Sequence, residues 1–179
     1  QLNEVMKALE NREFKVYFQP QYDAISNRIH GAEALSRWIR DDGTMIMPKD
    51  FISFMESEGI ILDLDWYVLD EVCRFMKGQK ESGNRIVPIS VNFSRLHLRE
   101  EDCLERINAI VDFYEVDHAF VVIEITESIF TEDSETVSTF CDRLRENGYK
   151  VAIDDFGSGY SSLCFLKDVN VDILKLDKA

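Results

Sequence analysis

The sequence predicts an α/β fold in which a mainly parallel sheet follows an antiparallel hairpin. Six apolar segments of strand length occur along the chain, and segments with helical periodicity separate most of the later ones. The segment FVVIEI at 120–125 is continuously apolar up to Glu124, as expected of a parallel strand that is buried on both faces. Strands that alternate with helices in this way are typical of βαβ units, and therefore of a parallel sheet.

The first two strands are expected to pair as an antiparallel hairpin. The first runs over 14–22, Asn27 supplies a turn, and the second runs over 29–35. Residues 1–13 come before the hairpin and carry apolar side chains at helical spacing, so we expect a linker helix there. Because the chain does not begin with methionine, we expect it to be part of a longer protein.

The rest of the chain alternates between helix and strand without an interior linker, which indicates a single domain over residues 1–179. A long helical pattern begins at Pro48 and is expected to stop at Gly78 and Gly83. The other elements are expected as helices at 104–114 and 133–148 and as strands at 85–93, 120–125, 149–153 and 171–176.

The composition indicates a globular domain and excludes some functions. The formal net charge is −14, so the surface is unsuited to coating a nucleic acid polymer. A small anionic ligand stays compatible with this charge if metal ions supply the positive charge. The four cysteines lie far apart and are expected to be free thiols. With no signal peptide and no long apolar run, we expect a cytoplasmic domain without direct membrane contact, or the cytoplasmic part of a membrane-anchored protein.

Polar groups occur where the predicted strands end. Because the carboxyl ends of parallel strands meet at one edge of a sheet, these groups are expected to converge. They all offer oxygen atoms, which favours Mg2+ or Mn2+ over zinc. A single carboxylate would more simply be a solvated loop residue, but repetition at several strand ends favours a metal site. The candidate metal ligands are Glu33, Asn92, Glu124, Asp154 and Asp155.

Lys175 lies inside an apolar strand and admits two interpretations. Its ammonium can steer a metal-bound hydroxide or balance transition-state charge, with Asp177 on the same side of the strand. Alternatively, Lys175 faces outward from an edge strand and discourages aggregation. Gly157 and Gly159 follow the paired aspartates and suit a loop that folds over a metal site, although an ordinary βα turn also uses glycine. The three histidines lack a metal-ligand spacing and are expected to be structural.

Five sequence blocks occur in a fixed order over nearly the whole chain. They are EAL at Glu33–Leu35 followed by Arg37, VNFS at Val91–Ser94, EITES at Glu124–Ser128, DDFGSGYSSL at Asp154–Leu163 and LKLD at Leu174–Asp177. Together they resemble the EAL domain family of bacterial cyclic di-GMP phosphodiesterases. The resemblance implies a TIM-like (β/α)8 barrel with an antiparallel opening strand, here truncated after about six strands.

The resemblance also implies hydrolysis of cyclic di-GMP to linear pGpG with two Mg2+ or Mn2+ ions. On the family pattern the first ion is held by Glu33, Asn92, Glu124 and Asp154, and Asp155 serves the second ion. The implied catalytic residues are Glu33, Asp155 and Lys175, of which the lysine orients the nucleophilic water. The implied substrate contacts are Gln19, Leu35 and Arg37, to which we add Asp177. Glu127 is implied to brace the loop that holds Gly157 and Gly159.

A second interpretation stays open at this point: a non-catalytic cyclic di-GMP receptor or protein-interaction module, as in degenerate members of the family. The family also carries later blocks of EGVE and QG type that do not occur in these 179 residues. We therefore expect the complete protein to be an active phosphodiesterase and the 179-residue fragment alone to be inactive. The expected partners are cyclic di-GMP and either a second copy, as a homodimer, or further domains of a larger chain.

Overall fold

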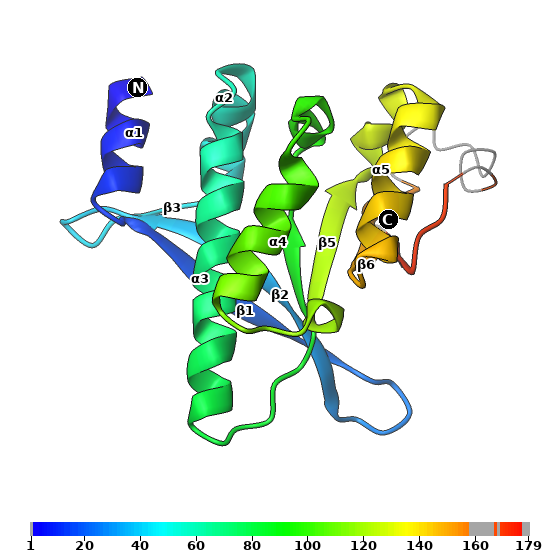
Figure 1. The fold of residues 1–179 in the computed structure, drawn as a ribbon. Coiled ribbons are helices and arrows are strands. Elements are labelled where there is room, and N and C mark those ends of the chain that lie inside the picture. Colours follow the sequence, from blue (N-terminus) through cyan, green and yellow to red (C-terminus); the bar gives the residue numbers. More distant parts are fainter. Residues whose placement is uncertain (1, 158–166, 168, 177–179) are drawn as a thin grey trace.

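The computed structural model describes residues 2–157, 167 and 169–176 (Figure 1). Its sheet follows the order β1-β2-β4-β5-β6-β7, with the short strand β3 paired to β2. Antiparallel pairing joins β1 to β2 and β2 to β3, and the later pairs are parallel. The strands are β1 (Phe14–Tyr22), β2 (Ile29–Ile39), β3 (Met45–Ile46), β4 (Ile89–Asn92), β5 (Val121–Thr126), β6 (Lys150–Phe156) and β7 (Ile173–Leu176). The predicted hairpin and parallel sheet are both confirmed.

The helices α3, α4 and α5 lie side by side along one side of the sheet (Figure 1). The α-helices are α1 (Leu2–Glu10), α2 (Ile52–Ser57), α3 (Ile61–Glu81), α4 (Cys103–Phe113) and α5 (Ser134–Glu146). Short 3-10 helices connect them to the strands: η1 (Pro48–Asp50), η2 (Arg95–Arg99), η3 (His118–Phe120) and η4 (Glu127–Thr131). Together these elements form the mixed α/β architecture of a partial TIM-like barrel.

Several predicted boundaries were wrong: β2 continues to Ile39, β6 continues to Phe156 and β7 begins only at Ile173. The strand expected at 85–93 begins only at Ile89, because Pro88 has no N–H to donate to a neighbouring strand. Gly78 does not stop helix α3, which continues to Glu81, since one glycine inside a helix costs only about 1 kcal/mol. The helix ends before Gly83, whose φ of 73° lies in the left-handed region that glycine adopts readily.

The core forms between the sheet and the helices that cover it. Its fully buried side chains include Leu69 and Val72 of α3, Ile107 of α4 and Ile123 of β5. Helix α1, expected as a linker, also packs on this core, because its apolar positions Val5 and Ala8 are only 1% exposed. No helix within the described ranges is long and apolar enough to cross a membrane.

Candidate active site at the carboxyl ends of the strands

Strand pairing places four of the predicted metal ligands on one face of the sheet. Glu33 of β2 pairs with the residue two positions before Asn92 of β4, and Asn92 pairs with Glu124 of β5. Glu124 in turn pairs with the residue two positions before Asp154 of β6. Paired residues share a face, and so do residues two apart in a strand, so all four side chains project from the same face.

The carboxylates of Glu33, Glu124 and Asp154, called the carboxylate cluster below, lie close together. One ligand oxygen from each lies within 4.8 Å of the other two. The amide Nδ2 of Asn92 lies 3.5 Å from Glu33 Oε1. The predicted convergence of these four groups is therefore present in the fold.

Lys175 of β7 reaches into the carboxylate cluster. Its Nζ lies 2.8 Å from Glu33 Oε2 and 3.2 Å from Asp154 Oδ1, and it donates a hydrogen bond to Glu124 Oε1. The ammonium thus points toward the cluster and not outward from an edge strand. This geometry decides between the two interpretations that the sequence left open for Lys175.

Burial governs the charges in the cluster. The Glu124 side chain is 0% exposed, and its burial raises the pKa of Glu124 to about 7. The neighbouring charges of Glu33 and Asp154 add to this rise in pKa, while Lys175 opposes it. Burial alone would lower the pKa of Lys175, but hydrogen bonds to Glu124 and Glu33 raise it above its ordinary value. The lysine therefore stays charged, but it balances only one of three carboxylates.

Two features of the cluster suit a divalent cation: the ligand atoms are oxygens, and one carboxylate oxygen makes no hydrogen bond to the described residues. Glu124 Oε2 is buried and has no hydrogen-bond partner among the residues that the structure describes. A buried polar atom without a partner is costly, and a cation would satisfy this one. The donors are all oxygen atoms, which are the ligands that Mg2+ and Mn2+ prefer.

Asp154 and Asp155 form a β-bulge. Strands β6 and β7 pair on both sides of them, but at this point two residues of β6 oppose the single residue Lys175 of β7. Asp155 adopts a left-handed φ of 55°, which interrupts the alternation of side chains along the strand. Both aspartates consequently line one pocket of about 420 Å3, which Glu33 and Asn92 also line.

Glu127, which the resemblance implies would brace the loop after β6, contacts the first residue after that strand, Gly157. Oε2 of Glu127, in η4, accepts a hydrogen bond of 3.2 Å from the backbone N–H of Gly157. Gly157 has a φ of 99°, a conformation that a residue with a Cβ atom rarely adopts. The other glycine predicted for this loop, Gly159, lies outside the described residues.

The predicted substrate contacts differ in how near they lie to the carboxylate cluster. Gln19 of β1 is the register partner of Glu33, and Leu35 lines the 420 Å3 pocket. Arg37 shares the face of Glu33, and its Nη1 donates to a backbone carbonyl, that of Ser36, at 2.8 Å. Neither Gln19 nor Arg37 is among the residues that line the pocket. Asp177 lies outside the described residues.

Sequence reasoning missed a buried polar pair behind the pocket. Asp65 of α3 lines the pocket, and its Oδ2 accepts a 2.8 Å hydrogen bond from the backbone N–H of Ser94. The same oxygen lies 3.1 Å from His97 Nε2, and His97 is only 1% exposed. Of the predicted free thiols, those at Cys73, Cys103 and Cys141 are buried and unpaired, and the fourth cysteine is not described.

A mainly parallel sheet that carries carboxylates, an amide and a lysine at its strand ends is typical of an α/β-barrel protein, and these groups form a candidate divalent-cation site. The chain belongs to the EAL domain family, whose sequence model matches residues 2–179. The family named by resemblance is thus confirmed.

Similar proteins include the probable cyclic di-GMP phosphodiesterase PdeB of Escherichia coli (strain K12), which is 35% identical over 172 residues. That match covers 96% of this chain and 33% of PdeB. The signaling protein YkoW of Bacillus subtilis (strain 168) is 31% identical over 173 residues, covering 97% of this chain and 22% of YkoW. The chain therefore spans a third or less of the length of these relatives.

A similar solved structure is the PaMucR phosphodiesterase in complex with c-di-GMP. It matches with a TM-score of 0.90 and 31% sequence identity, covering 98% of this chain and 71% of that chain. The EAL domain of Mycobacterium smegmatis DcpA matches with a TM-score of 0.69 and 27% identity, covering 90% of this chain and 62% of that chain. These matches confirm the fold class predicted from the sequence.

Proposed function

We propose that the protein that carries this domain hydrolyses cyclic di-GMP to linear pGpG, with Mg2+ or Mn2+ as cofactor. The observation that carries the proposal is the convergence of the carboxylate cluster, Asn92 and Lys175 at the carboxyl ends of the strands. Membership in the EAL domain family supports it, as does the likeness to a phosphodiesterase whose structure is a c-di-GMP complex.

In this proposal the carboxylate cluster and Asn92 hold one ion, and Asp155 serves a second ion. Bound ions of this kind lower the pKa of a water molecule and neutralise charge on a phosphodiester. The bulge supports the assignment of Asp155, because it places this carboxylate on the same pocket as Asp154. A protein with a net charge of −14 can then bind an anionic dinucleotide, because the bound cations make the site itself more positive than the rest of the surface.

Lys175 and Glu33 are the residues that we assign to the reaction itself, with Asp155. The ammonium of Lys175 lies within 2.8 Å of Glu33, so it can orient a water molecule held beside that carboxylate. It also stays charged, which suits the stabilisation of negative charge that develops on the phosphate.

The substrate is held by groups around the pocket. Leu35 supplies an apolar wall, Gln19 an amide, and Arg37 a guanidinium that can bind a phosphate through two parallel hydrogen bonds. Arg37 would first have to release the carbonyl of Ser36. From the sequence alone, we assign Asp177 to substrate binding and Gly159 to the loop that follows Asp155.

The proposal is tested by the product that the complete protein forms from cyclic di-GMP in the presence of Mn2+. Mass spectrometry should identify linear pGpG, and Glu33→Gln should abolish its formation. Glu105→Gln is the matched control, because Glu105 is an exposed carboxylate paired with Arg143 on the helical layer, away from the cluster. Binding of cyclic di-GMP without any pGpG would instead support the non-catalytic receptor.

The setting of the domain is also a proposal. We place it in the cytoplasm, because the buried cysteines of the described residues are free thiols, as expected in a reducing compartment. We expect it to act as a homodimer or as one domain of a larger chain. Size-exclusion chromatography with light scattering on the complete protein would distinguish these arrangements.

A further inference from the structure

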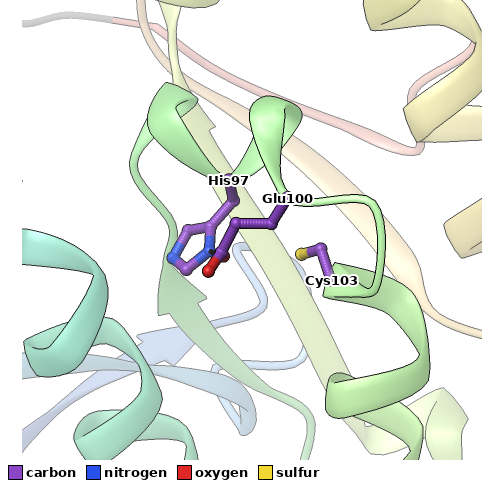
Figure 2. Close-up of side chains that lie close together, drawn as sticks. All are labelled: His97, Glu100 and Cys103. Atoms are coloured by element: carbon purple, nitrogen blue, oxygen red, sulfur yellow. Dashed lines mark hydrogen bonds and ion pairs between the residues drawn. The ribbon is translucent and has the colours of Figure 1, made fainter.

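We propose a second metal site, for a transition-metal ion such as Zn2+, formed by His97, Glu100 and Cys103. One ligand atom from each residue lies within 4.8 Å of the other two. Figure 2 shows the carboxylate of Glu100 against the His97 ring and the thiol of Cys103 facing the same space. The site uses no residue of the carboxylate cluster, so it does not rest on the proposed function.

The backbone brings these three side chains together through two successive turns, which are separated by the extended backbone of Glu100. His97 lies in η2, Glu100 caps the end of η2, and Cys103 is the first residue of α4. The N–H of Glu100 donates to the carbonyl of His97 at 3.1 Å, and the N–H of Cys103 donates to the carbonyl of Glu100 at 3.3 Å. The ligand atoms of the three side chains consequently lie within 4.8 Å of one another.

The imidazole of His97 is oriented as in many metal-ligating histidines. Its Nε2 lies 3.1 Å from Asp65 Oδ2, and its Nδ1 lies 2.5 Å from Glu100 Oε2. A histidine that binds a metal usually donates its other N–H to a carboxylate, which fixes the tautomer and the ring orientation. Asp65 can therefore hold Nε2–H while Nδ1 and Glu100 face the ion.

Cys103 packs in the core and adds a soft ligand. It is 3% exposed, and its thiol has no hydrogen-bond partner among the described residues. Burial raises the pKa of this thiol to about 12, so without an ion it is protonated and unreactive. Binding of a metal replaces the thiol proton, which passes to solvent.

The combination of nitrogen, oxygen and sulfur ligands favours Zn2+ over the hard cations expected at the carboxylate cluster. A pocket of about 400 Å3, lined by Glu100, Cys103 and residues of α5 that include Thr136 and Phe140, adjoins the site. This pocket gives an ion a path of entry and a water molecule access to a fourth coordination position.

The second site is linked to the active-site pocket through Asp65. The carboxylate of Asp65 faces His97 and also accepts the N–H of Ser94, two residues after Asn92. An ion at His97 would therefore hold the segment that follows β4. We assign it a positioning role for this segment and no part in the chemistry.

Cobalt spectroscopy tests the proposal, because a cysteine ligand gives a thiolate-to-cobalt charge-transfer band in the near ultraviolet. The protein is titrated with Co2+ in excess Mg2+, which occupies oxygen sites. We expect the band to saturate at one equivalent of Co2+ and to be displaced by Zn2+. Cys103→Ser should abolish the band, and Glu100→Gln and Asp65→Asn should each weaken Co2+ binding about 10- to 100-fold.

Cys141→Ser is the matched control, because Cys141 is equally buried and burial raises its pKa to about 12 as well. This variant should keep the band, and its circular dichroism should match that of Cys103→Ser. The absence of a band in the unmodified protein would overturn the proposal. A band of full intensity in Cys103→Ser would also overturn it, because the sulfur ligand would then lie elsewhere.

Discussion

Lys175 donates a hydrogen bond to Glu124, a carboxylate that is completely buried under the strand ends. The pair joins β7 to β5, two strands that are not neighbours in the sheet. The Lys175 ammonium therefore has two roles: it balances negative charge in the carboxylate cluster, and its hydrogen bond connects β7 to β5. These two roles can be separated by experiment.

Replacement of Lys175 should affect stability and rate but leave metal binding in place. Lys175→Ala removes the partner of a buried carboxylate, so the free energy of unfolding of the metal-free protein should fall by about 3 kcal/mol. Added Mn2+ should recover most of this loss, because the ion supplies the missing charge. The kcat for cyclic di-GMP should fall at least about 100-fold. Thermal unfolding with and without Mn2+, and steady-state kinetics, measure these effects.

The comparison is with Glu33→Ala, which should weaken Mn2+ binding itself. Lys77→Ala is a control for loss of a lysine, since Lys77 lies on α3 and its ammonium lies 4.0 Å from the exposed carboxylate of Glu115. Near-normal turnover in both Lys175→Ala and Glu33→Ala would show that the site is assigned to the wrong residues.

The affinity for Mn2+ should depend on pH through Glu124. Its pKa in the folded, metal-free protein is raised to about 7, so a proton competes with the ion below that pH. The apparent association constant should rise by about tenfold per pH unit between pH 5 and 7 and level off above pH 7. Isothermal titration calorimetry at several pH values measures this slope.

The raised pKa of Glu124 also means that the metal-free protein becomes less stable as the pH rises. Glu124 holds its proton more tightly when folded, so its contribution to stability is complete below its ordinary pKa and is lost as the pH rises through about 7. Glu124→Gln should remove both pH effects. An unchanged slope of Mn2+ affinity in this variant would assign the proton to another group.

The charge of Asp155 and its backbone conformation can be tested separately. Asp155→Asn should preserve the bulge, because asparagine tolerates the left-handed φ of 55°, but it should reduce Mn2+ binding to fewer than two ions. Asp155→Gly should likewise fold normally and lose the ion. Metal stoichiometry by elemental analysis in the complete protein measures the result. Two tightly held ions in Asp155→Asn would contradict the role given to this carboxylate.

Much of the fold could be predicted because local patterns decide it. Alternating and continuous apolar runs predicted the strands. The helix predicted from residue 133 begins there because the Asp133 carboxylate caps α5, accepting a hydrogen bond from Thr136 N–H at 3.0 Å. The short strand β3 was missed, because a strand of two residues has no periodicity to detect. Its position is set by pairing with the extended end of β2.

The ligand types of the site could be predicted, but their exact arrangement could not. Residue type and strand ends were enough to select Glu33, Asn92, Glu124 and Asp154. The bulge was not visible, because a shift in register depends on the neighbouring strand. The contact between Asp65 and His97 was not visible either, because it joins residues 32 positions apart in sequence.

The 179-residue fragment should have far less phosphodiesterase activity than a longer protein. In the described structure β1 and β7 are the two ends of an open sheet, whereas a (β/α)8 barrel closes on itself and typically has about 250 residues. We expect the fragment to aggregate or pair through these edges. Turnover of cyclic di-GMP should be compared with that of a chain extended by about 70 residues toward barrel length. Equal specific activities would place the whole catalytic unit within residues 1–179.

Turnover of cyclic di-GMP before and after removal of metal tests the central claim most directly. The complete protein is treated exhaustively with a chelator and then supplied with Mg2+, Mn2+ or Ca2+, and pGpG formation is followed by chromatography. We predict that chelation abolishes turnover and that Mg2+ or Mn2+ restores it. Ca2+ should restore it poorly, because its coordination is longer and looser and it acidifies bound water less. Full turnover by the chelated protein would contradict the assignment of the carboxylate cluster as a catalytic metal site.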